Sequence, residues 1–172
     1  SKIVTGKEAE EVMTRTLKDD ALIQATIYFR YYVHQALKIA GMGDQLLDSL
    51  QIWHDQMALG LTTWAEKPEP SRSDCHAWSA SPNVEFFRTI LGIESQAPGF
   101  KEVRIAPSLG ELKEVSGKMP HPEGFISVSY QKNGKELIAD IELPAHTQGT
   151  FIWEGKEYPL NSGKQTVRVT LN

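Results

Sequence analysis

The spacing of hydrophobic and polar positions changes near residue 95. Before this point apolar residues recur every three or four positions, which is typical of amphipathic helices. After it apolar and polar residues alternate, which is typical of strands with one face in a core. The pattern therefore predicts an α+β chain with two domains, residues 1–95 and residues 96–172.

Four helices are predicted in the first domain, over residues 7–17, 21–40, 44–59 and 82–91. The second should be buried nearly all round, because apolar residues occupy two of its faces. The residues expected to face inward include Leu22, Phe29, Val33, Leu46, Leu50, Trp53, Met57, Val84, Phe87, Ile90 and Leu91. Four helices are few for an independent core, which suggests that neighbouring helices complete the domain.

About seven short strands are predicted in the second domain. Alternation marks Val103 and Ile105, residues 126–130 and residues 137–143, and continues to Leu171. Asn133-Gly134 is a strong signal for a two-residue hairpin, because these residues tolerate positive φ. Glu154-Gly155 indicates a second tight turn. Such a series of strands and turns favours an antiparallel β-sandwich.

Composition narrows the classes of function. The 172 residues carry a net charge of −4, which argues against a nucleic-acid or membrane-surface partner. No apolar run approaches the length of a membrane span. The single cysteine excludes an internal disulfide and a thiolate-rich zinc site. Asp74, His76 and His54 match no recognised ligand spacing, so neither a metal nor a cofactor is expected.

Candidate chemistry is concentrated in residues 61–79, a predicted loop with two prolines that interrupts the helical pattern. Trp64, Glu66, His76 and Trp78 all lie within it. Indole faces suit the apolar faces of sugars, and glycoside hydrolysis uses a pair of carboxyl groups, of which Glu66 is a candidate. Structural alternatives to a catalytic or sugar-binding role also remain open. Glu66 could be a solvated loop residue, and the indoles of Trp64 and Trp78 could pack against the helix ends.

Two runs in and next to this loop resemble the end of the catalytic domain of bacterial α-L-rhamnosidases, namely residues 60–66 and residues 71–78. Further motifs resemble that family's passage into its C-terminal β domain. These are Leu91-Gly92-Ile93, Pro98-Gly99-Phe100 and Ile105-Ala106-Pro107. The resemblance implies that residues 1–95 are the last helices of an (α/α)6 barrel and that a small β-sandwich follows. It implies inverting hydrolysis of terminal α-L-rhamnose from glycans or glycosides.

Residue by residue, the resemblance matches Glu66 to the family's general base and His76 to a histidine that contacts the sugar. Trp64 and Trp78 flank these positions and are weaker candidates for sugar contact. Arg72 is expected to clamp a substrate, to pair with Asp74 or Glu69, or to cap a helix carbonyl.

The family's general acid lies upstream of these motifs. We therefore expect the chain to be an inactive fragment of a longer enzyme. A periplasmic or secreted location is favoured for that parent, with the cytoplasm as the alternative. In such a fragment some apolar helix faces lack the barrel helices that would cover them. We expect these faces, such as the one with Leu22, Phe29 and Val33, to cause self-association.

A different class of function remains open for the second domain. It could be a carbohydrate-binding module or a structural module, with the helices as a docking segment. A binding module needs two or three aromatic rings exposed on one face, whereas a structural module buries them. Trp153 and Tyr158 are the residues that distinguish these alternatives.

Overall fold

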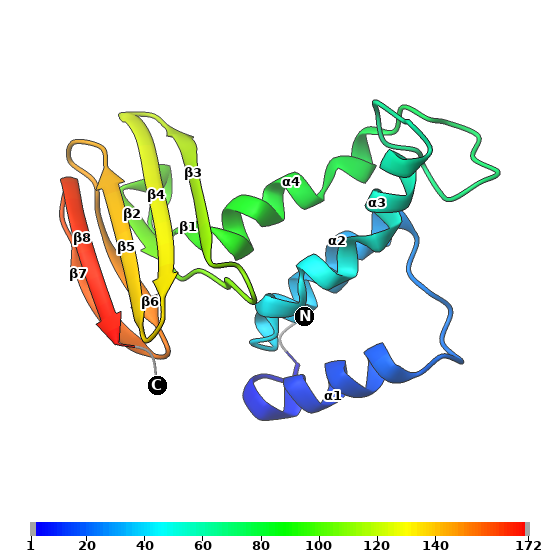
Figure 1. Cartoon of the computed structure of the whole chain (residues 1–172), viewed down its shortest axis with the longest axis horizontal. Helices are drawn as coiled ribbons and strands as arrows, with labels where there is room; N and C mark the ends of the chain where they lie inside the picture. Colours follow the sequence, from blue (N-terminus) through cyan, green and yellow to red (C-terminus); the bar gives the residue numbers. More distant parts are fainter. Residues whose placement is uncertain (1–2, 171–172) are drawn as a thin grey trace. The chain divides into compact units, whose positions relative to one another are not determined.

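The computed structural model describes residues 3–170 and divides the chain into two compact units, Ser1–Glu85 and Phe86–Asn172. Figure 1 shows helices in the first unit and strands in the second. The boundary lies ten residues before the one predicted from the change in pattern. The reason is that β1 (Ile93–Ser95) already pairs with β2 (Glu102–Ile105) and so belongs to the sheet.

The first unit is helical, with short 3₁₀ turns between its helices. Its elements are α1 (Gly6–Lys18), α2 (Ile27–Ile39), η1 (Gly43–Gln45), η2 (Leu47–Leu50), α3 (Gln51–Ala58), η3 (Ala77–Ala80) and α4 (Pro82–Glu85). The predicted helix over residues 44–59 is thus three shorter pieces. Its buried residues include Leu46, Leu50 and Trp53, as predicted, but Met57 is exposed.

Helix α2 begins at Ile27 instead of residue 21, because the Thr26 side chain accepts a hydrogen bond from the Phe29 N–H and caps the helix there. The prediction of a helix buried nearly all round is wrong. Ile27, His34 and Leu37 are buried, whereas Phe29 is 57% exposed. Leu22 lies before the helix and is also exposed.

Polar contacts hold α2 against its neighbours in the first unit. Ser49 Oγ donates to the Leu46 carbonyl at 2.6 Å, so the hydroxyl accepts the 3.0 Å hydrogen bond from His34 Nε2. Gln35 Nε2 donates to the buried Glu85 carboxylate at 2.9 Å. These bonds fix α2 to the turn before α3 and to α4.

The second unit is a pair of four-stranded sheets, preceded by a π-helical turn, η4 (Phe86–Ile90). Its remaining elements are η5 (Pro98–Phe100), β3 (Glu114–His121), β4 (Gly124–Asn133), β5 (Glu136–Leu143), β6 (Gln148–Trp153), β7 (Lys156–Leu160) and β8 (Gly163–Thr170). One sheet has the order β1-β2-β6-β7 and the other β3-β4-β5-β8. The predicted helix over residues 82–91 is α4 followed by η4, and Val84 is exposed, contrary to prediction.

The α+β prediction is confirmed, with one exception to the antiparallel pattern. Strands β2 and β6 pair in parallel, with Val103 opposite Gly149. Every other strand pair in the described residues is antiparallel. Leu171 lies outside the described residues.

The core of the second unit consists of the inward-facing residues of the strands. Tyr130 and Phe151 are fully buried and stack with ring centroids 6.2 Å apart. The Tyr130 hydroxyl donates to the Leu91 carbonyl at 2.8 Å, which ties the segment before β1 to β4. Burial raises the pKa of Tyr130.

The two predicted hairpins both occur. Glu154 and Gly155 have φ of 47° and 76°, as a type I′ turn requires. The other turn is one residue later than predicted. Asn133 pairs with Glu136, so Gly134 and Lys135 form the connection.

Strand β2 packs so closely against β6 that there is no room for a side chain at Gly149. A Cβ added there would lie 2.3 Å from the Val103 carbonyl oxygen, a backbone atom of the paired strand. Gly149→Ala should lower the free energy of unfolding of the second unit by about 2 kcal/mol, since overpacking a fixed backbone is destabilising. Urea unfolding followed by the fluorescence of Trp153, the tryptophan of this unit, measures the loss.

Gly117→Ala is the matched control. Its added Cβ would meet the tip of the Leu91 side chain at 2.4 Å, and a side-chain tip can move aside. An equal loss of stability in both variants would contradict the assignment of the β2–β6 contact as the rigid one.

Candidate functional site

Residues 61–76, here called the site loop, form a long excursion between α3 and η3 (Figure 1). Two backbone hydrogen bonds fold the loop back on itself. The His76 N–H donates to the Trp64 carbonyl at 2.8 Å, and the Glu66 N–H donates to the Ser73 carbonyl at 2.9 Å. Trp64, Glu66 and His76 are thereby brought together at the base of the loop, and residues 67–72 form its tip.

The residue before Glu66 fastens the loop to the helical unit. The Ala65 N–H donates to Gln56 Oε1 at 2.9 Å, and Ser79 Oγ donates to the Ala65 carbonyl at 2.7 Å. Trp53 Nε1 donates in turn to the Ser79 carbonyl at 2.6 Å. Since all four residues are buried, water does not compete for these bonds. The backbone that carries Glu66 is therefore rigidly placed.

The carboxylate of Glu66 is paired with Arg72 across the loop. Arg72 Nε lies 2.5 Å from Oε2 and Nη2 lies 2.6 Å from Oε1, a two-point pairing. The hydrogen bonds from Arg72 lower the pKa of Glu66 against a smaller opposing effect of burial. The charges of Arg72, His76 and Lys67 lower it further. Glu66 is thus held in its ionised form.

Sequence reasoning missed this pairing. Arg72 pairs with Glu66 instead of the expected Asp74 or Glu69. The Glu69 carboxylate accepts a hydrogen bond from the Ser71 N–H. The Glu66–Arg72 contact arises because the Glu66–Ser73 backbone bond folds the tip back. No spacing rule for helices or strands applies to such a loop.

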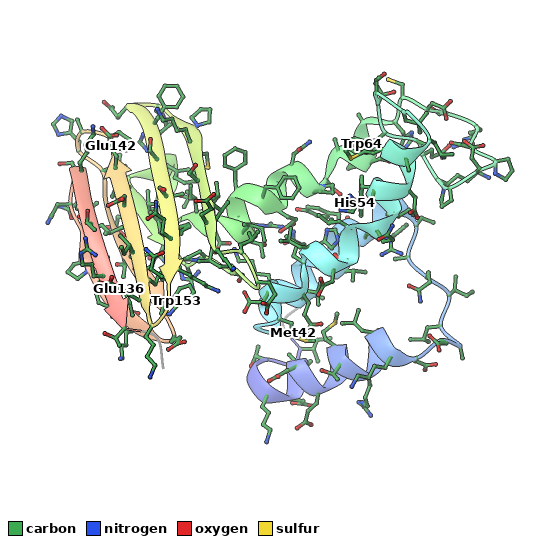
Figure 2. All side chains as sticks on the ribbon, in the orientation of Figure 1. Met42, His54, Trp64, Glu136, Glu142 and Trp153 are labelled. Atoms are coloured by element: carbon green, nitrogen blue, oxygen red, sulfur yellow. The ribbon has the colours of Figure 1, made fainter. Side chains whose placement is uncertain are left out.

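The two indoles of the loop region have different surroundings. Trp64 is half-buried and packs against Ile27, Leu50 and Trp53 beside α3 (Figure 2). Trp78 lies on η3, is 62% exposed, and meets Tyr28 edge to face at 4.8 Å between centroids. Trp64 therefore anchors the loop, whereas Trp78 presents its ring to solvent.

Other candidate chemistry finds little support in the part of the chain described. Residues 3–170 contain no group of three or more His, Cys, Asp or Glu side chains arranged to hold a metal ion. Cys75 is free and exposed. Over the same residues, no helix is long and apolar enough to cross a membrane.

The aromatic residues of the sandwich face its core. Tyr130 and Phe151 are buried, and Trp153 and Tyr158 are half-buried against the same cluster. Phe125 on β4 is 58% exposed. These strands do not present the row of exposed rings that a sugar-binding face requires.

Comparison with known proteins finds relatives of the second unit. A sequence model of the bacterial α-L-rhamnosidase C-terminal domain matches residues 92–168. An α-L-rhamnosidase of Alteromonas sp. (strain LOR) is 32% identical over 68 residues, which are 39% of this chain and 7% of that protein. The resemblance to the C-terminal part of bacterial α-L-rhamnosidases is therefore confirmed, and its sequence support lies in residues 92–168.

Solved structures extend the likeness to the helical unit. The α-L-rhamnosidase of Aspergillus terreus matches 94% of this chain with a TM-score of 0.81 at 20% identity, over 21% of its own length. The rhamnosidase of Bacillus sp. GL1, of family GH78, matches 76% with a TM-score of 0.70 at 29% identity, over 15% of its length. The chain thus spans about a fifth or less of these relatives.

The hydrogen bond from the Ala65 N–H to Gln56 can be tested by substituting each of two glutamines of α3. Gln56→Met removes the acceptor of a buried N–H, which should lower the free energy of unfolding of the first unit by about 1–3 kcal/mol. Hydrogen exchange of the Ala65 amide should quicken. Gln51 bonds Asp55 on the exposed face, so Gln51→Met should leave both quantities nearly unchanged. Unchanged exchange at Ala65 in Gln56→Met would contradict the fastening.

The Arg72 pairing predicts a titration shift. Arg72→Gln should raise the pKa of Glu66 toward its ordinary value, which carbon NMR of the side-chain carboxyl measures. The pairing stabilises the loop above the carboxyl's ordinary pKa, and its contribution is lost as the pH falls through the lowered pKa. Arg168→Gln, which breaks a pair with Glu136 in the sandwich, is the control and should not move Glu66. An unmoved Glu66 pKa in Arg72→Gln would contradict the cause assigned here.

Proposed function

We propose that this chain supplies the general base of an α-L-rhamnosidase, and that Glu66 is that base. The observation that carries the proposal is an ionised carboxylate on a fastened loop, at the position where the sequence resembles the family's catalytic motif. The substrate is a glycan or glycoside with a terminal rhamnose. The first unit represents the last helices of the catalytic barrel.

The pairing with Arg72 is compatible with this role. A general base must be ionised to accept a proton from water. Each carboxylate oxygen has two lone pairs, and Arg72 engages one on each oxygen. The second lone pairs remain for water, and the Arg72 side chain is itself 80% exposed. The pairing therefore orients Glu66 without enclosing it.

Inversion requires a second carboxyl group. An inverting site holds its acid and base about 6.5–9.5 Å apart, so that the attacking water fits between the base and the sugar. The resemblance assigns the acid to a motif upstream of the residues matched here. This chain contributes half of the pair, and we propose that it does not turn over substrate alone.

The neighbours of Glu66 take supporting roles. The charge of His76 acts on the Glu66 carboxylate, and the two residues share the base of the loop. This proximity supports the proposal that His76 contacts a sugar bound beside Glu66. Trp78 is available for sugar contact through its exposure, whereas the packing of Trp64 favours a structural role.

A structural role is also proposed for the sandwich. Trp153 and Tyr158 pack against its core, which argues against the alternative of a carbohydrate-binding module. Its fold supplies a separate, well-packed core next in sequence to the helical unit.

The inactivity of the chain is directly testable. The purified 172-residue protein should release no 4-nitrophenol from 4-nitrophenyl α-L-rhamnoside above the rate of a buffer blank. Sustained release that disappears in Glu66→Gln would show that the chain is a complete enzyme.

The role of Glu66 is testable in an α-L-rhamnosidase that contains this segment. Glu66→Gln should lower kcat by about 10²–10⁴-fold, the usual contribution of a general base. Azide needs no deprotonation, so it should restore turnover and yield the inverted rhamnosyl azide. Glu69→Gln, at the exposed tip of the same loop, is the matched control and should retain activity. Full activity of Glu66→Gln would refute the assignment.

A further inference from the structure

Strands β7 and β8 lie next to each other on one side of the sandwich, and each is the last strand of its sheet (Figure 1). Only Asn161 and Ser162 separate the two strands in sequence. Tyr158 on β7 and Val167 on β8 pack against the core but are only half-buried. This side of the sandwich is therefore incompletely covered by the residues that the structure describes.

The four edge strands of the sandwich differ in how well they can accept another strand. An edge strand carries a row of backbone N–H and C=O groups without partners, and proteins usually protect such edges. Strand β1 has three residues, β3 contains Pro120 and β7 contains Pro159, features that hinder pairing. Strand β8 has eight residues and no proline. In residues 3–170, no backbone hydrogen bond reaches its free side. It is thus the edge best able to accept a strand.

The basic residues of β8 do not prevent such pairing. Basic side chains on an edge strand usually discourage it. On β8, however, Arg168 forms an ion pair with Glu136 of β5 at 3.3 Å, and Lys164 stands opposite Glu142 of β5. Their charges are balanced within the sheet, so an incoming strand needs no acidic residues of its own.

The sequence of β8 fits a second copy of itself in one antiparallel register. A two-fold axis at Val167 places this residue opposite its twin. Arg168 then stands opposite Thr166, and Lys164 opposite Thr170. An axis at Thr166 would instead place Lys164 opposite Arg168, and an axis at Arg168 would place Arg168 opposite its twin. Like charges directly opposite each other are destabilising, so the charge pattern selects the register centred on Val167.

We propose that β8 pairs with β8 of a second copy of the chain about a two-fold axis at Val167, which joins two four-stranded sheets into one of eight strands. The pairing satisfies the backbone groups of the free edge and covers both copies of Val167. The two copies contribute the same surface, as in the common two-fold dimers of soluble proteins. This inference does not depend on the role proposed for Glu66.

Cross-linking tests the register. Residues directly opposite in an antiparallel pair have Cα atoms about 4.5–5.5 Å apart, within reach of a disulfide. The test uses the 172-residue chain with its exposed cysteine removed by Cys75→Ser. With oxidised glutathione, Val167→Cys should form a disulfide-linked dimer, seen on a non-reducing gel. Val115→Cys, also half-buried but on the edge strand β3, is the matched control and should stay monomeric. No dimer from Val167→Cys, or equal yields from both variants, would overturn the inference.

Sedimentation velocity gives a second readout without a cross-link. An eight-residue strand pair is a small interface, so a monomer–dimer equilibrium is expected at about micromolar to millimolar concentrations. Thr170→Lys should raise the Kd of the dimer about fivefold, because the new ammonium stands opposite Lys164 of the second copy. Within its own sheet it stands opposite Glu136, so the sandwich should not be weakened. Ser116→Lys adds the same charge to the exposed face of β3 and should leave the Kd unchanged.

Two results of this experiment would contradict pairing through β8. One is a monomer throughout the concentration range. The other is a dimer that Phe29→Lys dissociates while Thr170→Lys has no effect, which would assign self-association to the exposed face of α2.

Discussion

The placement of Glu66 depends on the backbone of one buried residue, Ala65. Its N–H and carbonyl are both taken up by side chains, Gln56 from α3 and Ser79 from η3. A loop of this length has many conformations to lose, and a few buried hydrogen bonds select one of them because leaving either group unpaired is costly. Trp53 extends the same network by bonding Ser79. The packing of α3 and η3 thus sets the position of a carboxylate that lies in neither element.

The Arg72 pairing has two opposite consequences for the base role proposed for Glu66. It orients the carboxylate and keeps it ionised, but a lowered pKa also makes Glu66 a weaker proton acceptor. Burial acts in the other direction, since it raises the pKa. Because the Arg72 side chain is mostly exposed, water competes with Glu66 for its hydrogen bonds.

The sequence predicts which segments form helices or strands better than it predicts where these elements begin and end. Alternation along β4 and β5 identifies the sandwich core, and the positive-φ turn at Glu154-Gly155 follows from local chemistry. Strand β3 lacks the usual run of β-branched and aromatic residues, and β1 is too short to show a period. The parallel β2–β6 pair and the Glu66–Arg72 contact join segments that no local pattern relates. The position of Glu66 in a motif was accessible from the sequence, but its partner was not.

The exposed aromatic rings of α2 are a second case in which the local sequence pattern does not determine burial. The sequence pattern gives α2 apolar residues on two faces, yet the first unit covers one of them, with Ile27, His34 and Leu37. Exposed apolar area of this kind usually marks a surface that meets another molecule. Tyr28 and Tyr32 differ from the aliphatic residues nearby because they are gathered with Trp78 around a defined hollow. Tertiary contacts therefore decide which of the two apolar faces of α2 is buried, and the periodicity of a single helix does not contain that information.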